Sequence, residues 1–306
     1  MSELSAATIE NTLTTAWLGR PVHHFVHLGS TNDLARQMAR RGAAEGTLVI
    51  AEEQTAGKGR LGRSWWAPPG SCLLLSLIFR PSLAPTQAQR LTMIAGLACA
   101  EAVEAQTGLR PGLKWPNDLV LAGRKLAGIL TELETAGERL DFAVLGLGLN
   151  VNVDFRQQAT DAELRDSAIG LLQVLGRPID RLALLNELLV RLEQRYERLR
   201  EGQSPHSEWA ARLVTLGQAV RVVTPSPFWA EEQRSEGDRE TGRQGEGKRS
   251  PCPPLSPAPP PLGSKGGGRV LEGRAVGVDA DGALLLRLAD GRVERVLTGD
   301  VTLGQG

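Results

Sequence analysis

Residues 114–130 read KWPNDLVLAGRKLAGIL, and this stretch predicts two short strands joined by a turn. The runs Leu119–Leu121 and Leu126–Leu133 are apolar and of strand length, and the residues between them are typical of a turn. Proline fixes its own φ and restricts the residue before it, so the Trp-Pro pair holds the backbone next to Lys114 rigid. A lysine fixed in this way suits an electrostatic role, although a surface hairpin with an incidental lysine has the same pattern.

Helical and strand patterns occur on both sides of this stretch. Thr86–Gln106 and Asp180–Arg200 carry apolar side chains three and four residues apart, which is typical of amphipathic helices. Ser30, with Asp33 three residues later, resembles a capping box and begins another helix. The other expected elements are a helix at Ala6–Leu18 and strands at Thr47–Glu53, Cys72–Phe79 and Phe142–Leu149. Together they predict a mixed α/β domain that ends near residue 212.

The residues after 212 have a different pattern. Ala219–Val223 alternates like a strand, and Gly268–Leu303 holds short strands separated by Asp281-Gly282 and Asp290-Gly291, both typical of hairpin turns. We therefore expect one domain at residues 1–212 and a second at residues 213–306.

Residues 230–268 have the composition of an insertion in the second domain. Eleven of the 20 residues from Glu231 to Ser250 are charged, and seven of the 11 from Pro251 to Pro261 are proline. Such a stretch buries too little apolar surface to offset its ordering entropy. We expect a disordered or polyproline-like loop between two strands of a small β-barrel, with a docking site for a proline-binding module as the less favoured alternative.

Charge and composition exclude several classes of protein. Lys and Arg number 35, as do Asp and Glu, so the net charge is zero, and the hydrophobic fraction is 41%. A balanced charge argues against general binding of nucleic acid or membranes, and we expect neither partner. The longest apolar run, Cys72–Phe79, is too short to cross a membrane, and the N-terminal residues lack the pattern of a signal peptide. The three cysteines show neither a disulfide framework nor metal-ligand spacing, so we expect a cytoplasmic protein.

The segment QTAGKGRLGRSWW, residues 54–66, is the strongest candidate for a ligand site. Gly57–Arg63 contains three glycines and three cations in seven residues, directly after an expected strand. Glycines let the backbone approach a ligand, and cations bind phosphate oxygens through charge-assisted hydrogen bonds. The pattern is neither a Walker A loop nor a Rossmann fingerprint. A flexible solvated turn is the alternative, but the indoles of Trp65 and Trp66 are costly on a bare surface, and one of them could stack on an adenine ring.

Five motifs, by their order and rough spacing, resemble those of the biotin protein ligases. They are Ser30-Thr31-Asn32, the Gly57–Arg63 loop, KWPND at 114–118, KLAGIL at 125–130 and GLGLNVN at 146–152. The resemblance covers residues from about 20 to 212 and extends to the C-terminal domain. It implies an α+β fold, in which a mixed-sheet catalytic domain of the biotin/lipoate ligase type is followed by a small C-terminal SH3-like β-barrel.

The resemblance implies an enzyme that activates biotin with ATP, forms biotinyl-5′-AMP and pyrophosphate, and passes biotin to a lysine of a carrier protein. The implied substrates are ATP and biotin, with Mg²⁺ held by ligands that the resemblance leaves open. The implied acceptor is the biotin carboxyl carrier protein of acetyl-CoA carboxylase. Fixed cations would offset the repulsion between the carboxylate and the α-phosphate. Exposed edge strands of the expected sheet also permit a homodimer.

The resemblance further implies a role for each matching residue. Lys114 and Arg60 are the implied catalytic residues, with Lys114 holding the biotin carboxylate and the α-phosphate oxygens. The implied biotin-binding residues are Ser30, Thr31, Asn32, Gln54, Lys58, Gly59, Arg60 and Lys114. The implied ATP- and adenylate-binding residues are Gly57, Lys58, Arg60, Arg63, Trp65, Asn117, Asp118 and Lys125, with Trp65 over the adenine. Structural alternatives are a helix cap for Ser30, a turn residue for Asp118 and a solvated charge for Lys125.

The sequence departs from the family pattern at two points. Lys58 stands where an arginine is usual, which keeps the charge but loses bidentate phosphate geometry. The residues before Ser30 hold one short helix, so we expect neither a DNA-binding domain nor a repressor role. A non-catalytic biotin sensor and a lipoate or octanoate ligase remain as alternatives. KWPND and KLAGIL favour biotin, because a lipoate pocket should be longer and more apolar.

Overall fold

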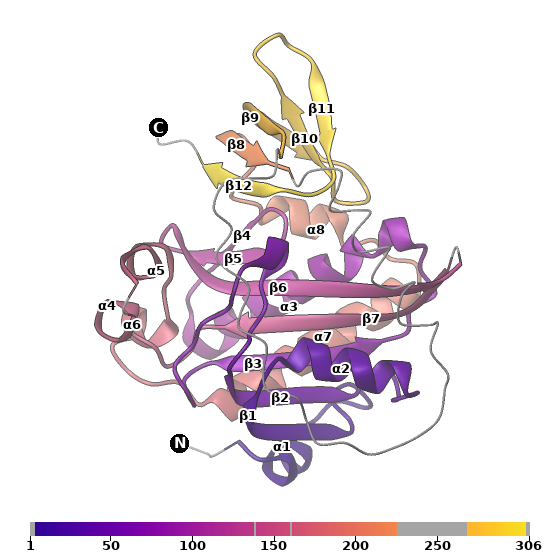
Figure 1. Ribbon diagram of the computed structural model, residues 1–306, viewed down its shortest axis with the longest axis vertical. Helices are drawn as coiled ribbons and strands as arrows, with labels where there is room; N and C mark the ends of the chain where they lie inside the picture. The colour runs from indigo at the N-terminus through magenta and orange to yellow at the C-terminus, as the bar shows by residue number, and fades with distance from the viewer. Residues whose placement is uncertain (1–3, 138, 160, 225–267, 304–306) are drawn as a thin grey trace, which may run out of the picture.

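The computed structural model describes residues 4–137, 139–159, 161–224 and 268–303. These residues form a large β-sheet with helices on both faces and a smaller sheet at the C-terminal end (Figure 1). The expected insertion at residues 230–268 lies outside the described residues, apart from Gly268. None of the helices in the described part of the chain has the length and hydropathy needed to cross a membrane.

The large sheet has seven strands in the order β1-β2-β3-β7-β6-β5-β4. β1 and β2 are parallel, and all other neighbours are antiparallel, so the sheet is mixed as expected. The strands are β1 Val22–Leu28, β2 Leu48–Gln54, β3 Leu73–Phe79, β4 Gly112–Lys114, β5 Asp118–Leu121, β6 Arg124–Ala136 and β7 Arg139–Leu149. The turn between β5 and β6 has positive φ at Ala122 (50°) and Gly123 (73°), which matches the twist of a two-residue hairpin.

Three helices cover the two faces of this sheet. α3 (Gln89–Thr107) and α7 (Arg181–Arg200) lie on one face and α2 (Thr31–Arg40) lies on the other (Figure 1). α3 is buried along most of its length because it is packed between the sheet and α7. Ala35 and Ala39 of α2 pack against Phe142 and Val144 of β7. Because these alanine side chains are small, α2 and its N-terminus lie close to the sheet.

The smaller sheet has five antiparallel strands in the order β11-β10-β9-β8-β12. They are β8 Ala219–Val223, β9 Val270–Val278, β10 Leu284–Arg287, β11 Val293–Val296 and β12 Asp300–Leu303. The two expected turns connect β9 to β10 and β10 to β11, with Gly282 and Gly291 at φ 89° and 86°. The fold class expected from the sequence is confirmed, while the domain division at residue 212 stays a prediction.

Several elements differ from the expected ones. α1 (Ala6–Thr12) ends before Leu18, because Asn186 and Glu193 of α7 accept hydrogen bonds from backbone N–H groups of residues 14–18. β1 was not expected, because three histidines interrupt its apolar pattern at the sheet edge. The short helices α4 Phe155–Gln158, α5 Ala162–Ser167, α6 Leu171–Leu175 and α8 His206–Ala211 give too few turns for a periodic signal. The expected homodimer stays a prediction.

Candidate active site

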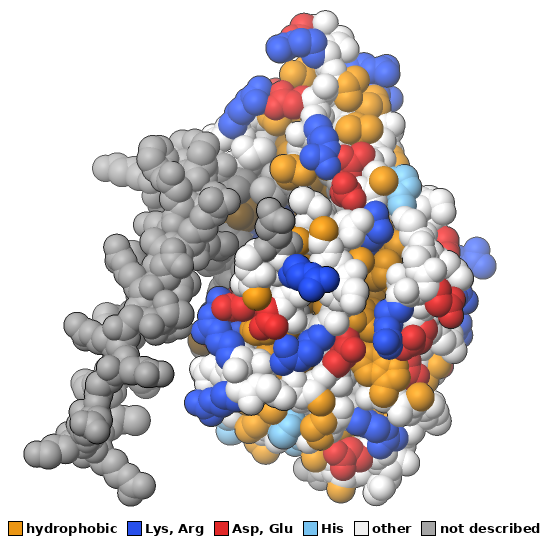
Figure 2. All heavy atoms as spheres, turned by 90° about the vertical axis from the view of Figure 1, so that its right-hand side faces the viewer, with side chains coloured by type: hydrophobic (Ala, Val, Ile, Leu, Met, Phe, Trp, Pro, Cys, Tyr) orange, Lys and Arg blue, Asp and Glu red, His pale blue; other side chains and the backbone are white. Residues whose placement is uncertain are grey.

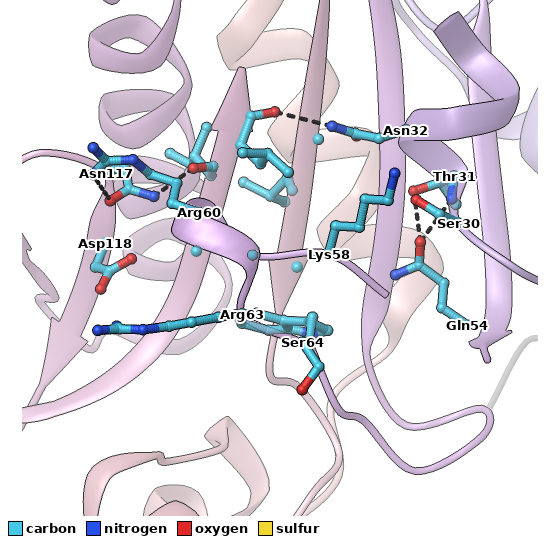
Figure 3. Close-up of a pocket in the computed structure, with 18 of the residues that line it drawn as sticks. Ser30, Thr31, Asn32, Gln54, Lys58, Arg60, Arg63, Ser64, Asn117 and Asp118 are labelled. Carbon is cyan, nitrogen blue, oxygen red and sulfur yellow. Dashed lines mark hydrogen bonds between the residues drawn. The ribbon is translucent and has the colours of Figure 1, made fainter. Parts of the chain in front are cut away.

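A pocket lies between the N-terminus of α2, the end of β2, strands β6 and β7, and the segment at residues 57–66 (Figure 3). Of the residues that the sequence singled out, Ser30, Thr31, Asn32, Gln54, Lys58, Gly59, Arg60, Arg63, Trp65, Asn117, Asp118 and Lys125 line this pocket. Gly57 and Lys114 are not among the described residues that line it. The structure therefore brings most of the expected residues together around one space.

The polar end of the pocket is built at the N-terminus of α2. Ser30 is the N-cap, and its hydroxyl accepts a hydrogen bond from the backbone N–H of Asp33 at 3.5 Å. Oε1 of Gln54 accepts two hydrogen bonds from Thr31, one from the backbone N–H at 2.7 Å and one from the hydroxyl at 3.0 Å (Figure 3). Ser30 thus caps its helix and lines the pocket at the same time, so the structural and functional interpretations of this residue coexist.

Leu130 supplies apolar surface between this polar end and the segment at 57–66. Leu75, Ile129 and Leu147 also line the pocket, but their side chains face the core on the α3 side of the sheet. They come from the adjacent strands β3, β7 and β6, and Leu75 and Leu147 are Cα partners. The pocket therefore combines a buried polar end with an apolar wall, an arrangement that binds a ligand with a polar head and an apolar body.

The segment at residues 57–66 is an ordered hairpin rather than a flexible turn. The backbone N–H of Gly59 donates to Arg63 O at 2.7 Å, and that of Trp65 donates to Gly57 O at 2.8 Å. A Cβ on Gly57 would lie 2.6 Å from Trp65 O, so this position accepts glycine alone without movement of the backbone. Gly57 therefore shapes the hairpin from outside the pocket.

Each cation of this hairpin has a partner in the protein. Lys58 Nζ lies 2.5 Å from Asp33 Oδ1, and both side chains are largely exposed, so this pair adds little stability. Arg60 donates to Asn117 Oδ1 at 3.1 Å. Burial lowers the pKa of the Arg60 guanidinium, and the nearby carboxylate of Asp118 opposes this shift. The guanidinium of Arg60 is thus held in position close to the carboxylate of the KWPND motif.

The C-terminal sheet completes the cationic side of the pocket. Arg60 Nη2 donates to Thr298 Oγ1 at 2.5 Å, and Arg63 forms an ion pair with Asp300, which lines the pocket. Thr298 and Asp300 were not expected from the sequence. No local signal could have found them, because they are more than 200 residues from the arginines that they contact.

Lys125 brings a fourth cation to the pocket. Its Nζ lies 2.8 Å from Asp118 Oδ1 and 5.5 Å from the centroid of a Trp65 ring. The Asp118 oxygen is buried and makes no hydrogen bond of good geometry, so the contact with Lys125 is an ion pair rather than a directed hydrogen bond. Lys125 is therefore part of the site and not simply a solvated hairpin charge.

Lys114 lies next to the described residues that line the pocket, although it is not itself among them. It lies on β4 as the Cα partner of Asp118 and is half-buried. Burial lowers the pKa of its ammonium group; Asp118 opposes this shift, whereas Lys125 and Arg63 add to it. The expected role of Lys114 in holding the carboxylate and the α-phosphate stays a prediction, and Lys125 of the same region lines the pocket.

The described residues offer no preformed metal cluster. Within the described part of residues 4–224 and 268–303, there is no group of three or more His, Cys, Asp or Glu side chains that is placed to hold a metal ion. Asp118 and Asp300 are the carboxylates that line the pocket in the described chain.

Comparison with known proteins gives a consistent result. Residues 26–150 match the Biotin/lipoate A/B protein ligase family, and residues 264–304 match the Biotin protein ligase C terminal domain. The bifunctional ligase/repressor BirA of Bacillus subtilis is 30% identical over 306 residues, covering 99% of this chain and 80% of that protein. The biotin--[acetyl-CoA-carboxylase] ligase of Mycobacterium tuberculosis is 39% identical over 203 residues, covering 64% of this chain and 72% of that protein. The solved structure of biotin protein ligase from Aquifex aeolicus in complex with biotin and ATP has a TM-score of 0.64 at 23% identity, covering 93% of this chain and 99% of that chain.

These features define a ligase of the biotin/lipoate type: a mixed sheet, a glycine-rich cationic hairpin over a pocket, and a small β-domain that follows. The chain belongs to the biotin protein ligases of the Biotin/lipoate A/B protein ligase family. The enzyme class expected from the sequence is thereby confirmed. The likeness to the Aquifex aeolicus structure shows the shared fold.

Proposed function

We propose that this ligase joins biotin to ATP, forming biotinyl-5′-AMP and pyrophosphate, and then transfers biotin to a lysine of a biotin carboxyl carrier protein. One observation carries the proposal: the polar end at Thr31 and Gln54 and the cations Arg60, Arg63 and Lys125 line a single pocket. The polar end suits an uncharged head group, and the cations suit a carboxylate and phosphates. The family and the names of the relatives support biotin as the acid.

In the first half-reaction, a carboxylate oxygen of biotin attacks the α-phosphorus of ATP. The bond from the α-phosphorus to the oxygen bridging it to the β-phosphorus breaks, and pyrophosphate leaves. Two anions must come together, so fixed cations around the entering and leaving oxygens lower the barrier. We assign this task to Arg60, Arg63 and Lys125, whose present partners already hold them beside the pocket. We also assign it to Lys114, the catalytic residue expected from the sequence, whose ammonium group is within the influence of Asp118, Lys125 and Arg63.

In the second half-reaction, the ε-amine of the acceptor lysine attacks the carbonyl carbon of the adenylate. The bond between this carbon and the AMP oxygen breaks, AMP leaves, and the amine gives up a proton to solvent. The relatives named biotin--[acetyl-CoA-carboxylase] ligase support the carboxyl carrier protein of that enzyme as the acceptor.

Two further assignments concern the nucleotide. We assign the adenine contact to Trp65, whose indole lies on β6 and β7 within the pocket. We assign Lys58 to the closure of the hairpin over the adenylate. Its present partner Asp33 is exposed, so Lys58 can leave this weak ion pair and bind the ligand instead.

Asp118 fits a magnesium ion accompanying ATP. Mg²⁺ in nucleotide sites is bound through one or two carboxylates together with phosphate oxygens, so a preformed cluster of ligands is not required. Oδ1 of Asp118 is buried, makes no hydrogen bond of good geometry and pairs with Lys125 Nζ at 2.8 Å, so an ion would bind this oxygen as Lys125 turns to the phosphates. A bound magnesium ion supplies positive charge that neutralises the phosphates.

We infer that the reaction takes place in the cytoplasm and without a nucleic acid partner. The described cysteines, Cys72 and Cys99, are buried free thiols, which suits a reducing compartment. On the face shown in Figure 2, the Lys and Arg side chains of the described residues are interspersed with Asp and Glu and form no continuous basic track.

The test is pyrophosphate release by the purified chain with ATP and Mg²⁺, comparing biotin, lipoate and no acid. We expect release with biotin alone, followed by transfer of biotin to a carrier domain but not to its Lys→Arg variant. Release with lipoate alone would make the chain a lipoate ligase. Biotin binding without pyrophosphate release would support a non-catalytic sensor instead.

A further inference from the structure

We propose that Asn117 is a positioning residue that holds the guanidinium of Arg60 with a neutral acceptor, so that the positive charge of Arg60 stays available to an anionic ligand. The inference rests on the proposed function, because it takes the phosphates of ATP as that ligand. Both side chains line the pocket, and Arg60 Nη1 donates to Asn117 Oδ1 at 3.1 Å (Figure 3).

The four cations of the described chain that line the pocket differ in the charge of their partners. Three of them form ion pairs with carboxylates: Lys58 with Asp33, Arg63 with Asp300 and Lys125 with Asp118. Each of these carboxylates competes with an anionic ligand for its cation. Arg60 is different, because among the described residues its acceptors are the amide oxygen of Asn117 and the hydroxyl of Thr298, and no carboxylate lies within ion-pair distance of it.

The hydrogen bonds of Asn117 fix which end of its amide faces Arg60. Nδ2 donates to the carbonyl oxygen of Ile129 at 2.6 Å, and that oxygen can only accept. On the other side, the guanidinium of Arg60 can only donate. The reverse orientation would set two acceptors against each other at Ile129 and two donors against each other at Arg60, which is unfavourable for half-buried groups. Asn117 therefore presents its oxygen to Arg60.

The backbone around Asn117 makes this acceptor rigid. The N–H of Ile129 on β6 donates to the carbonyl oxygen of Asn117 at 3.0 Å, so the main chain and the side chain of Asn117 both bond to the same residue. The carbonyl oxygen of Pro116 accepts from Gln89 Nε2 of α3, also at 3.0 Å. Arg60, in the hairpin at residues 57–66, is thus tied to a fixed point next to β5 and β6.

Removing the amide of Asn117 would change the partner of Arg60. Asp118 follows Asn117 in the chain, and its carboxylate already attracts Arg60 from beyond ion-pair distance. Without the amide, Arg60 is free to pair with Asp118, which would neutralise its charge and displace Lys125 from the same carboxylate. The neutral amide of Asn117 prevents this exchange.

An arginine without a carboxylate partner is ready to bind phosphate. Charge that is already in place stabilises a transition state without rearrangement of the site, whereas Arg63 and Lys125 first have to leave their carboxylates. We therefore expect Arg60 to meet the phosphates first. The amide of Asn117 keeps one hydrogen and one oxygen lone pair that these contacts do not use, so its expected contact with the nucleotide stays a prediction.

The test is a double-mutant cycle on pyrophosphate release with biotin and varied ATP. We expect Asn117→Ala to lower kcat/KM for ATP about tenfold, which is about 1.4 kcal/mol, in the wild-type background. In the Arg60→Gln background the same substitution should lower it less than about twofold, because Asn117 acts through Arg60. An undiminished loss in Arg60→Gln would overturn the proposal, since a direct contact with the nucleotide or a loosened β6 would act without Arg60.

Arg63→Gln provides the matched control cycle. Arg63 belongs to the same hairpin and lines the same pocket, but its partner is Asp300 rather than Asn117. The free-energy losses in Asn117→Ala and Arg63→Gln should therefore add. Equal coupling of Asn117 to both arginines would show a general disturbance of the hairpin and would also contradict the positioning role.

Asn117→Asp separates charge from geometry. This substitution keeps an oxygen acceptor beside Arg60 but makes the acceptor negative, so we expect kcat/KM for ATP to fall at least as far as in Asn117→Ala. Activity near the wild-type level would show that any acceptor is sufficient, and the requirement for a neutral one would be wrong.

Side-chain NMR of the arginines in the ligand-free chain gives a readout that does not depend on catalysis. On titration with inorganic pyrophosphate, the guanidinium resonance of Arg60 should respond at a lower concentration than that of Arg63, and this difference should vanish in Asn117→Asp. Responses at equal concentrations in the wild type would overturn the proposal. If the wild-type chain released no pyrophosphate with any acid, the proposed function would fail, and the titration would still decide whether Asn117 keeps Arg60 available.

Discussion

The indole of Trp65 occupies the space that a side chain on Gly148 would need. A Cβ on Gly148 would lie 2.5 Å from Cε2 of Trp65, and one on Gly128 would lie 2.9 Å from Cζ3. Gly128 and Gly148 are Cα partners on β6 and β7. Two adjacent glycines therefore form a flat floor for the indole, an approach of ring to backbone that a larger residue would prevent.

This floor predicts that Gly148→Ala displaces Trp65 and weakens nucleotide binding. Overpacking of this kind costs ~1–3 kcal/mol, so we expect the KM for ATP to rise about tenfold. Pyrophosphate release at varied ATP measures the effect. Gly277→Ala is the control, because the nearest atom to its Cβ is a leucine methyl at 3.7 Å. Equal KM values in the two variants would show that the floor does not position the indole.

The two lysines of the KWPND–KLAGIL region should differ in importance. Lys125 lines the pocket, whereas Lys114 lies on β4 and is not among the described residues that line it. Removing a cation that stabilises transition-state charge typically costs a factor of ~10²–10³ in kcat, so Lys125→Met should lose about that much pyrophosphate release. We expect a smaller loss in Lys114→Met, with similar unfolding midpoints for both proteins. A larger loss in Lys114→Met would make Lys114 the more important of the two lysines.

The contact between Arg60 and Thr298 predicts that the C-terminal sheet affects the binding of ATP at the pocket. Thr298→Val removes the hydroxyl that accepts from Arg60 Nη2, and we expect the KM for ATP to rise about fivefold while the biotin Kd stays constant. Thr302→Val is the matched control, because Thr302 lies on the neighbouring strand β12 with an exposed side chain. A similar rise in the control would indicate a general disturbance of the small sheet.

Trp115 predicts a second connection between the two sheets. Its indole is 1% exposed, and Nε1 donates to the carbonyl oxygen of Gly282 in the β9–β10 turn at 2.8 Å. Trp115→Phe removes this donor and loosens the small sheet, so the KM for ATP should rise as in Thr298→Val. The double variant should show less than the sum of the two free-energy changes, because both substitutions release the same sheet. Strict additivity would mean that the two contacts act independently.

The buried thiol of Cys99 predicts a loss of stability at alkaline pH. Burial raises the pKa of Cys99 from 9.0 to about 12. Between these values the unfolded chain releases a proton that the folded chain keeps, so the free energy of unfolding falls as pH rises, by at most ~1.4 kcal/mol per pH unit for this group. Denaturant unfolding between pH 8 and about pH 11 should show a shallower decline in Cys99→Ala than in the wild type. Identical slopes would contradict a protonated Cys99 in the folded state.

Local patterns were sufficient for most of the secondary structure. The hairpin between β5 and β6 and the helix α7 lie close to their expected residues, because apolar spacing and turn residues act over a few positions. β1 was not predicted, because its histidines interrupt the apolar pattern. At this edge of the sheet the strand forms through pairing with β2 and not through its side-chain pattern.

The candidate site was predictable to the extent that its residues form short motifs. Ser30-Thr31-Asn32, Gln54 and most of the cations and glycines of the segment at 57–66 were expected from the sequence, and the lining of one pocket includes Ser30, Thr31, Asn32, Gln54, Lys58, Gly59, Arg60 and Arg63. The pairing of Lys114 with Asp118 was not predictable, because it depends on the register of β4 against β5.

The sequence by itself determined the order of the elements, the balance of charge and the local chemistry of the glycine-rich hairpin, because each depends on neighbours along the chain. Only the tertiary structure decided that Lys125 lines the pocket, that Thr298 and Asp300 contact the arginines of the hairpin, and that Asn32 donates a hydrogen bond to Glu132. The physical reason is that these contacts join residues 98 or more positions apart or depend on strand register. Hydrophobic periodicity indicates which face of an element is buried, but not which distant side chain packs against it.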